Sequence, residues 1–250
     1  MKIIPLSEGS FTVDKTKVFV PFRKGVDELQ QRPVGSLLVE IQPFAVITSK
    51  DILLFDTGLG FHTNNGVMQL HQNLVDNNID PSSVTKILMS HLHKDHAGGI
   101  QNNKPGGLSK ELSFQNAVYY VNRNEFAFAS ENKTSSYIQE DFELLQHSDR
   151  LQLLDDTGIL DDYIFYEMTG AHSPYHTVFW IKENDEVVFF GGDVAPQLQQ
   201  MKNKFVAKYD FDGKKCMHLR QHWWKEGNEK SWTFLFYHDV KSPVFSYCNS

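Results

Sequence analysis

Four side chains of types that bind metal ions fall within six consecutive positions: His91, His93, Asp95 and His96. In extended backbone His91 and His93 project to the same side, because side chains alternate along a strand. If the chain then turns at Asp95 and His96, the four polar groups converge on one point. Imidazole nitrogen and carboxylate oxygen bind zinc at about 2.0–2.2 Å, and two metal ions share such a cluster at roughly 3.5–4 Å from each other. The run therefore predicts a binuclear metal site.

Two glycines, Gly98 and Gly99, follow the run. We expect them to let the backbone pass close to the metals and enter a helix without a clash. The alternative is a surface loop that is rich in histidine by chance. With 11 histidines among 250 residues, a chance cluster this dense is disfavoured.

Short apolar runs that end abruptly in polar residues recur along the chain. They read as buried strands, at residues 52–55, 87–89, 187–190 and 234–237. The polar residues that follow them are, in order, Asp56, Ser90 with His91, Asp193 and His238. Ionisable residues at strand ends are typical of a functional site in a layered α/β protein.

Helices are expected between these strands, at residues 67–77, 124–130, 137–147 and 214–226. Gly227 is expected to close the last of them as a C-terminal cap. Strands and helices alternate over the whole length, so the pattern predicts an α/β sandwich. No linker or short repeat divides the chain, and we expect residues 1–250 to form one domain.

Composition narrows the class of protein. The formal net charge is −7, which argues against a nucleic-acid groove or an anionic membrane surface as the main partner. The two cysteines, Cys216 and Cys248, are expected to be free thiols. No apolar run approaches the roughly 18 residues that cross a bilayer, and the first residues lack a signal-peptide core. We therefore expect a cytoplasmic protein.

The His-x-His-x-Asp-His run with its two glycines resembles the signature of the metallo-β-lactamase superfamily, whose fold is an αββα sandwich. Further motifs of that family follow in order between about residues 34 and 245. They are Leu54-Phe55-Asp56-Thr57-Gly58, Gly170-Ala171-His172-Ser173-Pro174-Tyr175-His176, Gly191-Gly192-Asp193 and Tyr237-His238-Asp239. The resemblance thus implies four layers, two mixed sheets inside and helices outside.

The resemblance also implies a ligand set. One metal ion would be held by His91, His93 and His172. The second would be held by Asp95, His96 and His238, with Asp193 bridging both. Asp95 would also pass a proton to the leaving group, and Asp56 and His176 would orient ligands from behind. The expected cofactors are two divalent ions, foremost Zn²⁺, and the expected reaction is hydrolysis by a metal-activated water.

The His-Asp form of the last motif is similar to the lactonase branch and its organophosphate-hydrolase-like relatives. This implies a lactone or related ester as substrate, with N-acyl homoserine lactone as one option. The best-known acyl-homoserine lactonases have a tyrosine three residues after the bridging aspartate, where this chain has Pro196. Three tyrosines could replace it in space: Tyr175, Tyr209 and Tyr237. The residues expected to line the substrate pocket are Phe22, Phe126 and Tyr209.

Other functions share parts of this pattern. A glyoxalase II-like thioesterase has the same ligands but favours a His-Glu final motif and late basic residues that grip a carboxylate. A phosphotriester hydrolase is a further alternative. A β-lactamase would normally be exported, and a flavodiiron protein would have glutamate at the position of His93. A metal-binding sensor of the same fold would usually have lost ligands, whereas all seven are present. The expected partner is thus a small ester or lactone, with no nucleic acid or membrane, and a homodimer remains an option.

Overall fold

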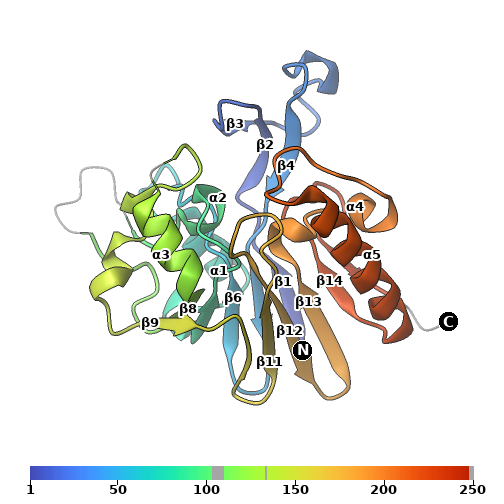
Figure 1. The fold of residues 1–250 in the computed structure, drawn as a ribbon. Helices are drawn as coiled ribbons and strands as arrows, with labels where there is room; N and C mark the ends of the chain where they lie inside the picture. Colours follow the sequence, from blue (N-terminus) through green and yellow to red (C-terminus); the bar gives the residue numbers. More distant parts are fainter. Residues whose placement is uncertain (103–109, 133, 248–250) are drawn as a thin grey trace.

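A computed structural model describes residues 1–102, 110–132 and 134–247. Two six-stranded sheets lie face to face at its centre, and helices cover their outer faces (Figure 1). The first sheet has the order β1-β5-β6-β7-β8-β9, with bounds Lys2–Pro5, Phe44–Ile47, Ile52–Phe55, Lys86–Leu88, Val118–Asn122 and Leu151–Leu154. The second has the order β10-β11-β12-β13-β14-β15, with bounds Thr157–Leu160, Ile164–Met168, Thr177–Glu183, Glu186–Phe190, Thr233–Leu235 and Val244–Ser246.

Three hydrophobic layers separate the four layers of backbone, because successive strand residues face opposite sides. On β6, Leu53 and Phe55 face the second sheet, while Leu54 faces the outer helices. On β13, Phe190 faces the first sheet and Phe189 packs toward the helix beyond. Apolar side chains on both faces of both sheets thus enforce the αββα sandwich predicted from the sequence.

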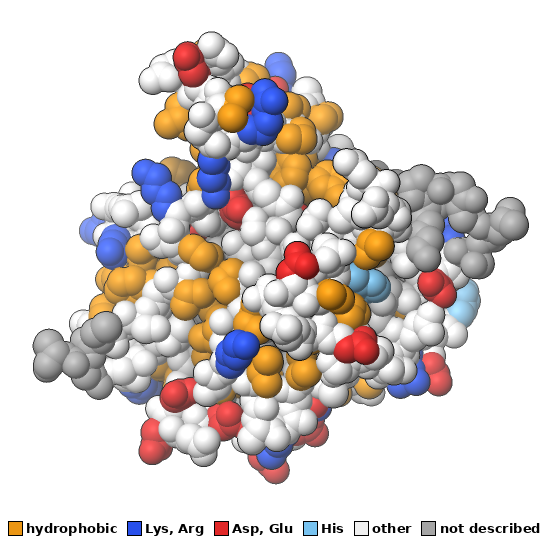
Figure 2. Space-filling view, turned by 180° about the vertical axis from the view of Figure 1, so that it is seen from behind, with side chains coloured by type: hydrophobic (Ala, Val, Ile, Leu, Met, Phe, Trp, Pro, Cys, Tyr) orange, Lys and Arg blue, Asp and Glu red, His pale blue; other side chains and the backbone are white. Residues whose placement is uncertain are grey.

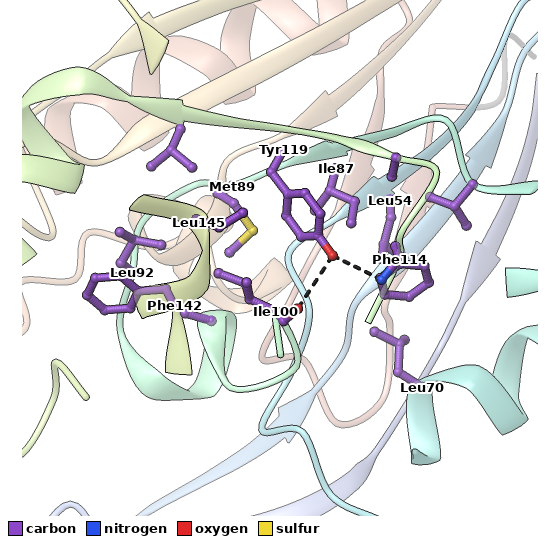
Figure 3. Packing of buried hydrophobic residues seen from close by; sticks show 14 of the residues in the cluster. Leu54, Leu70, Ile87, Met89, Leu92, Ile100, Phe114, Tyr119, Phe142 and Leu145 are labelled. Carbon is purple, nitrogen blue, oxygen red and sulfur yellow. Dashed lines mark hydrogen bonds between the residues drawn. The ribbon is translucent and has the colours of Figure 1, made fainter. Parts of the chain in front are cut away.

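The outer layer on the first sheet includes α1 (Gln69–Asp76) and α3 (Arg123–Glu131). Figure 3 shows the core beneath it, where the hydroxyl of the buried Tyr119 points toward Phe114 and Ile100. The Tyr119 hydroxyl accepts from the Phe114 N–H at 3.0 Å and donates to the Ile100 carbonyl at 3.4 Å. This phenol is therefore satisfied within the core.

The helix predicted over residues 137–147 is wrong. The segment forms two 3₁₀ turns, Gln139–Asp141 and Glu143–His147. The Gln101 side chain lies between the backbone groups that an α-helix would pair: it accepts from the Leu144 N–H and donates to the Glu140 carbonyl, both at 2.6 Å. A side chain inserted in this way interrupts the α-helical hydrogen-bond pattern.

The outer layer on the second sheet consists of α4 (Leu198–Lys202) and α5 (Gly213–Glu229). Gly227 does not cap α5 but lies inside it. A Cβ at this position would overlap the Phe234 ring, so the glycine permits close packing of helix on sheet. The left-handed residue that follows the helix is Ser231, at φ 54°.

A third, small sheet of order β3-β2-β4 joins Val20–Pro21, Gly9–Val13 and Leu37–Ile41. Its outer part projects beyond the sandwich at the top of Figure 1. We call residues 13–37 the N-terminal lobe. Figure 2 shows hydrophobic and basic side chains gathered on it, and Val18, Val20 and Leu29 are all more than half exposed.

Two predictions from composition concern single features. Cys216 is a buried free thiol, whereas Cys248 lies outside the described residues. Within the described parts of the chain, no helix combines the length and the apolar character needed to cross a membrane.

Candidate metal centre

The predicted ligands lie at one edge of the two sheets. β6 and β7 are parallel neighbours, so Asp56 and His91, which follow them, emerge side by side. β13 and β14 are parallel neighbours in the facing sheet, and Asp193 and His238 follow those strands. Carboxyl ends of parallel strands are the usual place for a site in an open α/β sheet. The topology therefore brings together residues that are far apart in the sequence.

The remaining ligands come from two connections. His93 is the N-cap residue of α2 (Lys94–Ala97), and Asp95 and His96 lie within this single turn of helix. We expect a helix after Gly98 and Gly99 from the sequence, but α2 precedes them. A Cβ on Gly99 would overlap the Thr57 carbonyl oxygen, so the glycines allow α2 to pack on the turn after β6. His172 lies in the loop between β11 and β12.

The seven side chains form overlapping groups whose ligand atoms lie within 4.8 Å of one another. These groups are His91 with His93 and His172, His91 with His96 and Asp193, and Asp95 with His96 and His238. Asp193 lies between the two ends of the cluster: its Oδ2 is 3.1 Å from His172 Nε2, and its Oδ1 is 3.0 Å from His238 Nε2. This is the arrangement that a bridging carboxylate requires.

Four of the histidines are oriented from behind by an oxygen that accepts from Nδ1, which leaves the Nε2 lone pair facing the centre. The pairs are His91 with Ser90 Oγ (3.0 Å), His96 with Asp56 Oδ2 (2.8 Å), His172 with Asp210 Oδ1 (2.9 Å) and His238 with the Glu40 carbonyl oxygen (2.8 Å). The fifth, His93, presents Nδ1 instead, at 2.9 Å from His91 Nε2 and 3.3 Å from His172 Nε2. A metal ion between these three nitrogens would accept the lone pairs of all of them.

The electrostatics of the cluster also favour cations. Burial, helped by the neighbouring charge of His96, lowers the pKa of His91 well below its usual range. Burial acts in the same direction on His96, but the carboxylates of Asp193, Asp95 and Asp56 outweigh it and raise the pKa of His96 well above the usual value. Burial would raise the pKa of Asp193, but the charges of His238 and His96 hold it well below the ordinary range. The Asp193 carboxylate therefore stays charged and stabilises positive charge at the centre.

Two inward atoms support the same conclusion. His96 Nε2 and Asp193 Oδ1 are buried without a hydrogen bond among the described residues, although they lie 3.1 Å apart. Unsatisfied polar atoms in an interior are costly, and a metal ion would give both of them a partner. Nitrogen and carboxylate ligands of this kind suit zinc and related transition metals. The residues present therefore fit two metal ions.

A family model for the metallo-beta-lactamase superfamily matches residues 38–224. The chain belongs to this superfamily. Membership and the ligand cluster together make it a metal-dependent hydrolase of the metallo-β-lactamase fold. No curated protein matches the chain.

Solved structures share the fold over nearly the whole chain. A probable metal-dependent hydrolase from Staphylococcus aureus has a TM-score of 0.79 at 20% identity, covering 100% of this chain and 93% of that one. The hydrolase AbOPH has a TM-score of 0.74 at 21% identity, covering 99% and 90%. AidC, described as a dizinc quorum-quenching lactonase, has a TM-score of 0.73 at 19% identity, covering 97% and 88%. At this level of identity, the likeness is one of fold.

Asp56 and His176, which we predict to orient ligands, contact the predicted ligand residues His96 and Asp193 directly. Asp56 accepts from the Ser90 N–H and Oγ–H, both at 2.7 Å, as well as from His96. His176 Nε2 accepts from the Asp193 N–H at 3.1 Å, so its lone pair is directed at the backbone rather than at a metal. Gly192, at φ 47°, makes this approach possible, because a Cβ there would lie 2.7 Å from His176 Nε2.

A cavity of about 1340 Å³ opens over the cluster, larger than the roughly 300–1,000 Å³ of common ligand pockets. Tyr209 lines it, as predicted. Phe126 instead lies in the core at 9% exposure, with its ring against Phe142, and Phe22 is not on the wall. The phenylalanines that line the cavity are Phe19, Phe128, Phe205 and Phe211.

The three tyrosines considered as substitutes for the one missing at Pro196 lie in different surroundings. Tyr237 is fully buried, and its hydroxyl donates to the Asp95 carbonyl oxygen at 2.6 Å. Tyr175 packs against Phe128 and does not line the cavity. Tyr209 lies on the wall, with its ring centroid 6.2 Å from that of His172. Of the three, Tyr209 is therefore the one that can reach a substrate.

Sequence reasoning missed several residues that support the ligands. Asp210 and the Glu40 carbonyl orient His172 and His238, and the Tyr237 ring stacks on His96 at 4.0 Å. Ser90 carried a signal, since it directly precedes the first ligand. Asp210 lies between two aromatic residues in a loop that no metal-binding pattern marks, so only the folded chain reveals its role.

Proposed function

We propose that the chain binds two zinc ions and hydrolyses a lactone or a related carboxylic ester. The observation that carries this proposal is the convergence of seven ligands, four of whose histidines are oriented by an acceptor behind them. The large, partly apolar cavity above the ligands supports an organic substrate. The fold shared with a structure described as a dizinc lactonase agrees with the choice of metal and substrate.

Two divalent ions, when bound, lower the pKa of water to near neutrality and polarise a carbonyl oxygen. The side chains of this protein then have two tasks. They hold the ester carbonyl beside the cluster, and they carry a proton from the attacking water to the leaving oxygen. In the net reaction the acyl carbon–oxygen bond breaks, water supplies the new hydroxyl on carbon, and its proton ends on the alkoxide.

We assign this proton transfer to Asp95. Its carboxylate lines the cavity, and its Oδ2 is 3.6 Å from His238 Nε2 and 3.8 Å from His96 Nε2. The hydrogen bond from the Tyr237 hydroxyl fixes the Asp95 backbone. The side chain is thus held between the cluster and the substrate, where a proton shuttle must lie.

We assign the orientation of the carbonyl to Tyr209. Burial raises the pKa of its hydroxyl to about 12, so the phenol stays protonated at neutral pH and can donate a hydrogen bond. It takes over the role of the tyrosine that is missing at Pro196. Phe19 and Phe128 supply apolar wall for the acyl part of the substrate.

The test is a hydrolysis panel on zinc-loaded protein, with lactones, oxoesters, thioesters, phosphotriesters and β-lactams. We expect about two zinc ions per chain, hydrolysis of lactones and oxoesters ahead of the other classes, and loss of activity in His172→Ala. His218→Ala, an exposed histidine on α5, is the matched control and should keep both metal and activity.

Each of the other outcomes identifies a different function. Preference for thioesters would favour a glyoxalase II-like enzyme, and preference for phosphotriesters a phosphotriester hydrolase. Zinc binding without hydrolysis of any class would favour a metal-binding sensor. Any of these three results would overturn the proposal.

A further inference from the structure

The cavity over the metal centre is basic, although the chain as a whole is acidic. Six basic side chains line it: Lys15, Lys17, Arg32, Lys94, Lys204 and Lys208. They come from three separate places, namely the N-terminal lobe, α2 and the loop that follows α4. The chain has 24 lysines and arginines against 31 acids, so a quarter of its basic side chains line this one cavity.

Acidic residues do not balance this charge. Four aspartates line the cavity, and three of them are engaged by the metal centre: Asp95 and Asp193 as predicted ligands, and Asp210 as the acceptor behind His172. The fourth, Asp14, accepts from the N–H and the hydroxyl of Thr16. With two divalent cations bound, the positive charges at the cavity would be six from the basic side chains and four from the metal ions. The negative charges would be four, one from each aspartate. The surplus is six positive charges.

The basic groups are available to a ligand. The ion pairs among the described residues involve other lysines and arginines, and none of these six takes part. Arg32 donates from Nε to the Leu29 carbonyl at 3.3 Å, which holds the side chain without neutralising it. Lys94 Nζ lies 5.7 Å from the centre of the Phe19 ring, on the cavity wall. Among the described residues these six charges therefore have no ion-pair partner, and they lie around a cavity that is open to solvent.

The same cavity has apolar wall. Phe128 lies on its first-sheet side, Val39 and Phe19 on the side of β4 and the N-terminal lobe, and Phe205 and Phe211 on the loop after α4. Phe211 is 69% exposed, which is unusual for a phenylalanine side chain. A ligand that matches this cavity needs an apolar chain or ring together with negative charge.

We propose that the enzyme selects esters or lactones that carry an anionic group on an apolar chain, and that the six basic side chains bind this anion. This inference rests on the proposed hydrolase function. It narrows the substrate class, since an N-acyl homoserine lactone carries no charge before its ring opens. The anion is a carboxylate or a phosphate-like group. The basic side chains of the N-terminal lobe, of α2 and of the loop after α4 act on it together.

The physical effect is focusing of the electrostatic field. A cleft lined by one sign of charge with apolar walls raises the local concentration and association rate of an oppositely charged substrate. Because the lysines are reached by solvent, salt screens them over a Debye length of about 8–10 Å. The preference for an anionic substrate should therefore weaken as salt is added.

Matched substrates test the proposal. The neutral ester is 4-nitrophenyl hexanoate, and its anionic partner is mono-4-nitrophenyl adipate, which has the same chain length and a terminal carboxylate. A third ester ends in a phosphonate and separates the two kinds of anion. We expect kcat/KM to be at least about tenfold higher for one of the anionic esters at low salt, and this ratio to fall as sodium chloride is raised.

The double variant Lys17→Gln/Lys208→Gln removes one charge from the N-terminal lobe and one from the loop after α4. It should lower the anionic-to-neutral ratio of kcat/KM by about tenfold. Lys225→Gln/Lys230→Gln, at exposed positions within and directly after α5, is the control, because it changes the net charge equally and neither residue lines the cavity. An equal rate on neutral and anionic esters, or a ratio that falls by the same amount in both double variants, would overturn the proposal.

A binding measurement separates this inference from the hydrolase proposal. The 4-nitroanilides of adipic and hexanoic acid resist hydrolysis, and their Kd values are measured by calorimetry on zinc-loaded protein. If no ester is hydrolysed but the adipic anilide binds more tightly, and the Lys17→Gln/Lys208→Gln variant removes the difference, the hydrolase proposal fails while the ligand class stands. Equal binding of the two anilides overturns the ligand class, whatever the activity.

Discussion

His172 presents a lone pair to the cluster only while its other nitrogen keeps the proton. Asp210 Oδ1, 2.9 Å from His172 Nδ1, holds that proton in place. The negative charge of the carboxylate also makes Nε2 a stronger donor to a metal. At the scale of single residues, metal affinity therefore depends on a side chain that touches no metal.

Asp210→Asn tests this dependence. A neutral amide oxygen is a weaker acceptor than a carboxylate, so we expect zinc affinity to fall by about 10- to 100-fold with the fold intact. Competition with a zinc-binding dye measures the affinity. Asp212→Asn is the matched control two residues away, because Asp212 caps α5 and asparagine caps helices equally well. Equal affinities in the two variants would show that Asp210 has no influence on the metal.

Tyr209→Phe removes one hydroxyl from the cavity wall. If this hydroxyl donates to the substrate carbonyl, we expect kcat/KM to fall by about 10- to 100-fold, with zinc content unchanged. Tyr175→Phe serves as control, since Tyr175 packs against Phe128 outside the cavity. Normal activity in Tyr209→Phe would mean that Tyr209 does not take the role of the tyrosine that is missing at Pro196.

At the scale of elements, the sequence predicted what depends on local pattern. Apolar runs placed the strands, and the polar residues directly after them, such as Asp56 and His91, lie at the ends of parallel strands as expected. The four-layer fold follows from the apolar character of both faces of those strands. These features are visible in sequence because each depends on neighbours along the chain.

Features that depend on distant contacts were not predicted. The segment 137–147 has a helical pattern, but Gln101 pairs with the backbone groups of residues 140 and 144. Gly227 looks like a helix cap, but the Phe234 ring explains it. Phe126 was expected in the pocket, yet it contributes to the core. In each case a tertiary contact outweighs the local preference.

Glu8 links the β1–β2 segment to the turn after β6, where its Oε2 accepts from the Leu59 N–H at 2.6 Å. Its side chain is partly accessible, but Oε1 is buried without a partner. Burial raises the pKa of this carboxyl from 4.5 to about 8. The folded state therefore holds a proton between these two pH values that the unfolded state releases, so the free energy of unfolding falls as pH rises from about 4.5 to 8.

Glu8→Gln keeps an acceptor for Leu59 but cannot ionise. We expect the variant to be more stable than the parent protein at pH 8–9, by up to a few kcal/mol, with the difference shrinking toward pH 5. Urea denaturation of zinc-loaded protein at several pH values measures it. Glu131→Gln, an exposed glutamate at the end of α3, should show no such dependence. A constant difference across this range would contradict the raised pKa.

At the scale of the whole molecule, charge is unevenly distributed. A chain of net charge −7 concentrates basic side chains around one cavity, and this concentration is what points to an anionic substrate. Composition argued against nucleic acid and an anionic membrane surface as the main partner, and that stays a prediction. The cytoplasmic location and the option of a homodimer also stay predictions.

The metal centre joins the two halves of the sandwich. His91 and His96 follow β7 of the first sheet, whereas Asp193 and His238 follow β13 and β14 of the second. All four side chains are less than one-tenth exposed. A metal ion that binds the folded chain only must stabilise it by mass action. The gain is about 4 kcal/mol when free metal exceeds Kd by about 1,000-fold.

Removal of metal should therefore destabilise the whole fold rather than one loop. For a chain of this size, 1 kcal/mol corresponds to a shift in Tm of roughly 2–4 °C, so we expect chelation to lower Tm by about 10 °C and zinc to restore it. Asp193→Asn removes the carboxylate charge shared by both halves, and its Tm should respond much less to zinc. Glu131→Gln should respond like the parent protein. A Tm that does not change with zinc or chelator would mean that the two sheets meet without help from the metal, and that the ligands converge for another reason.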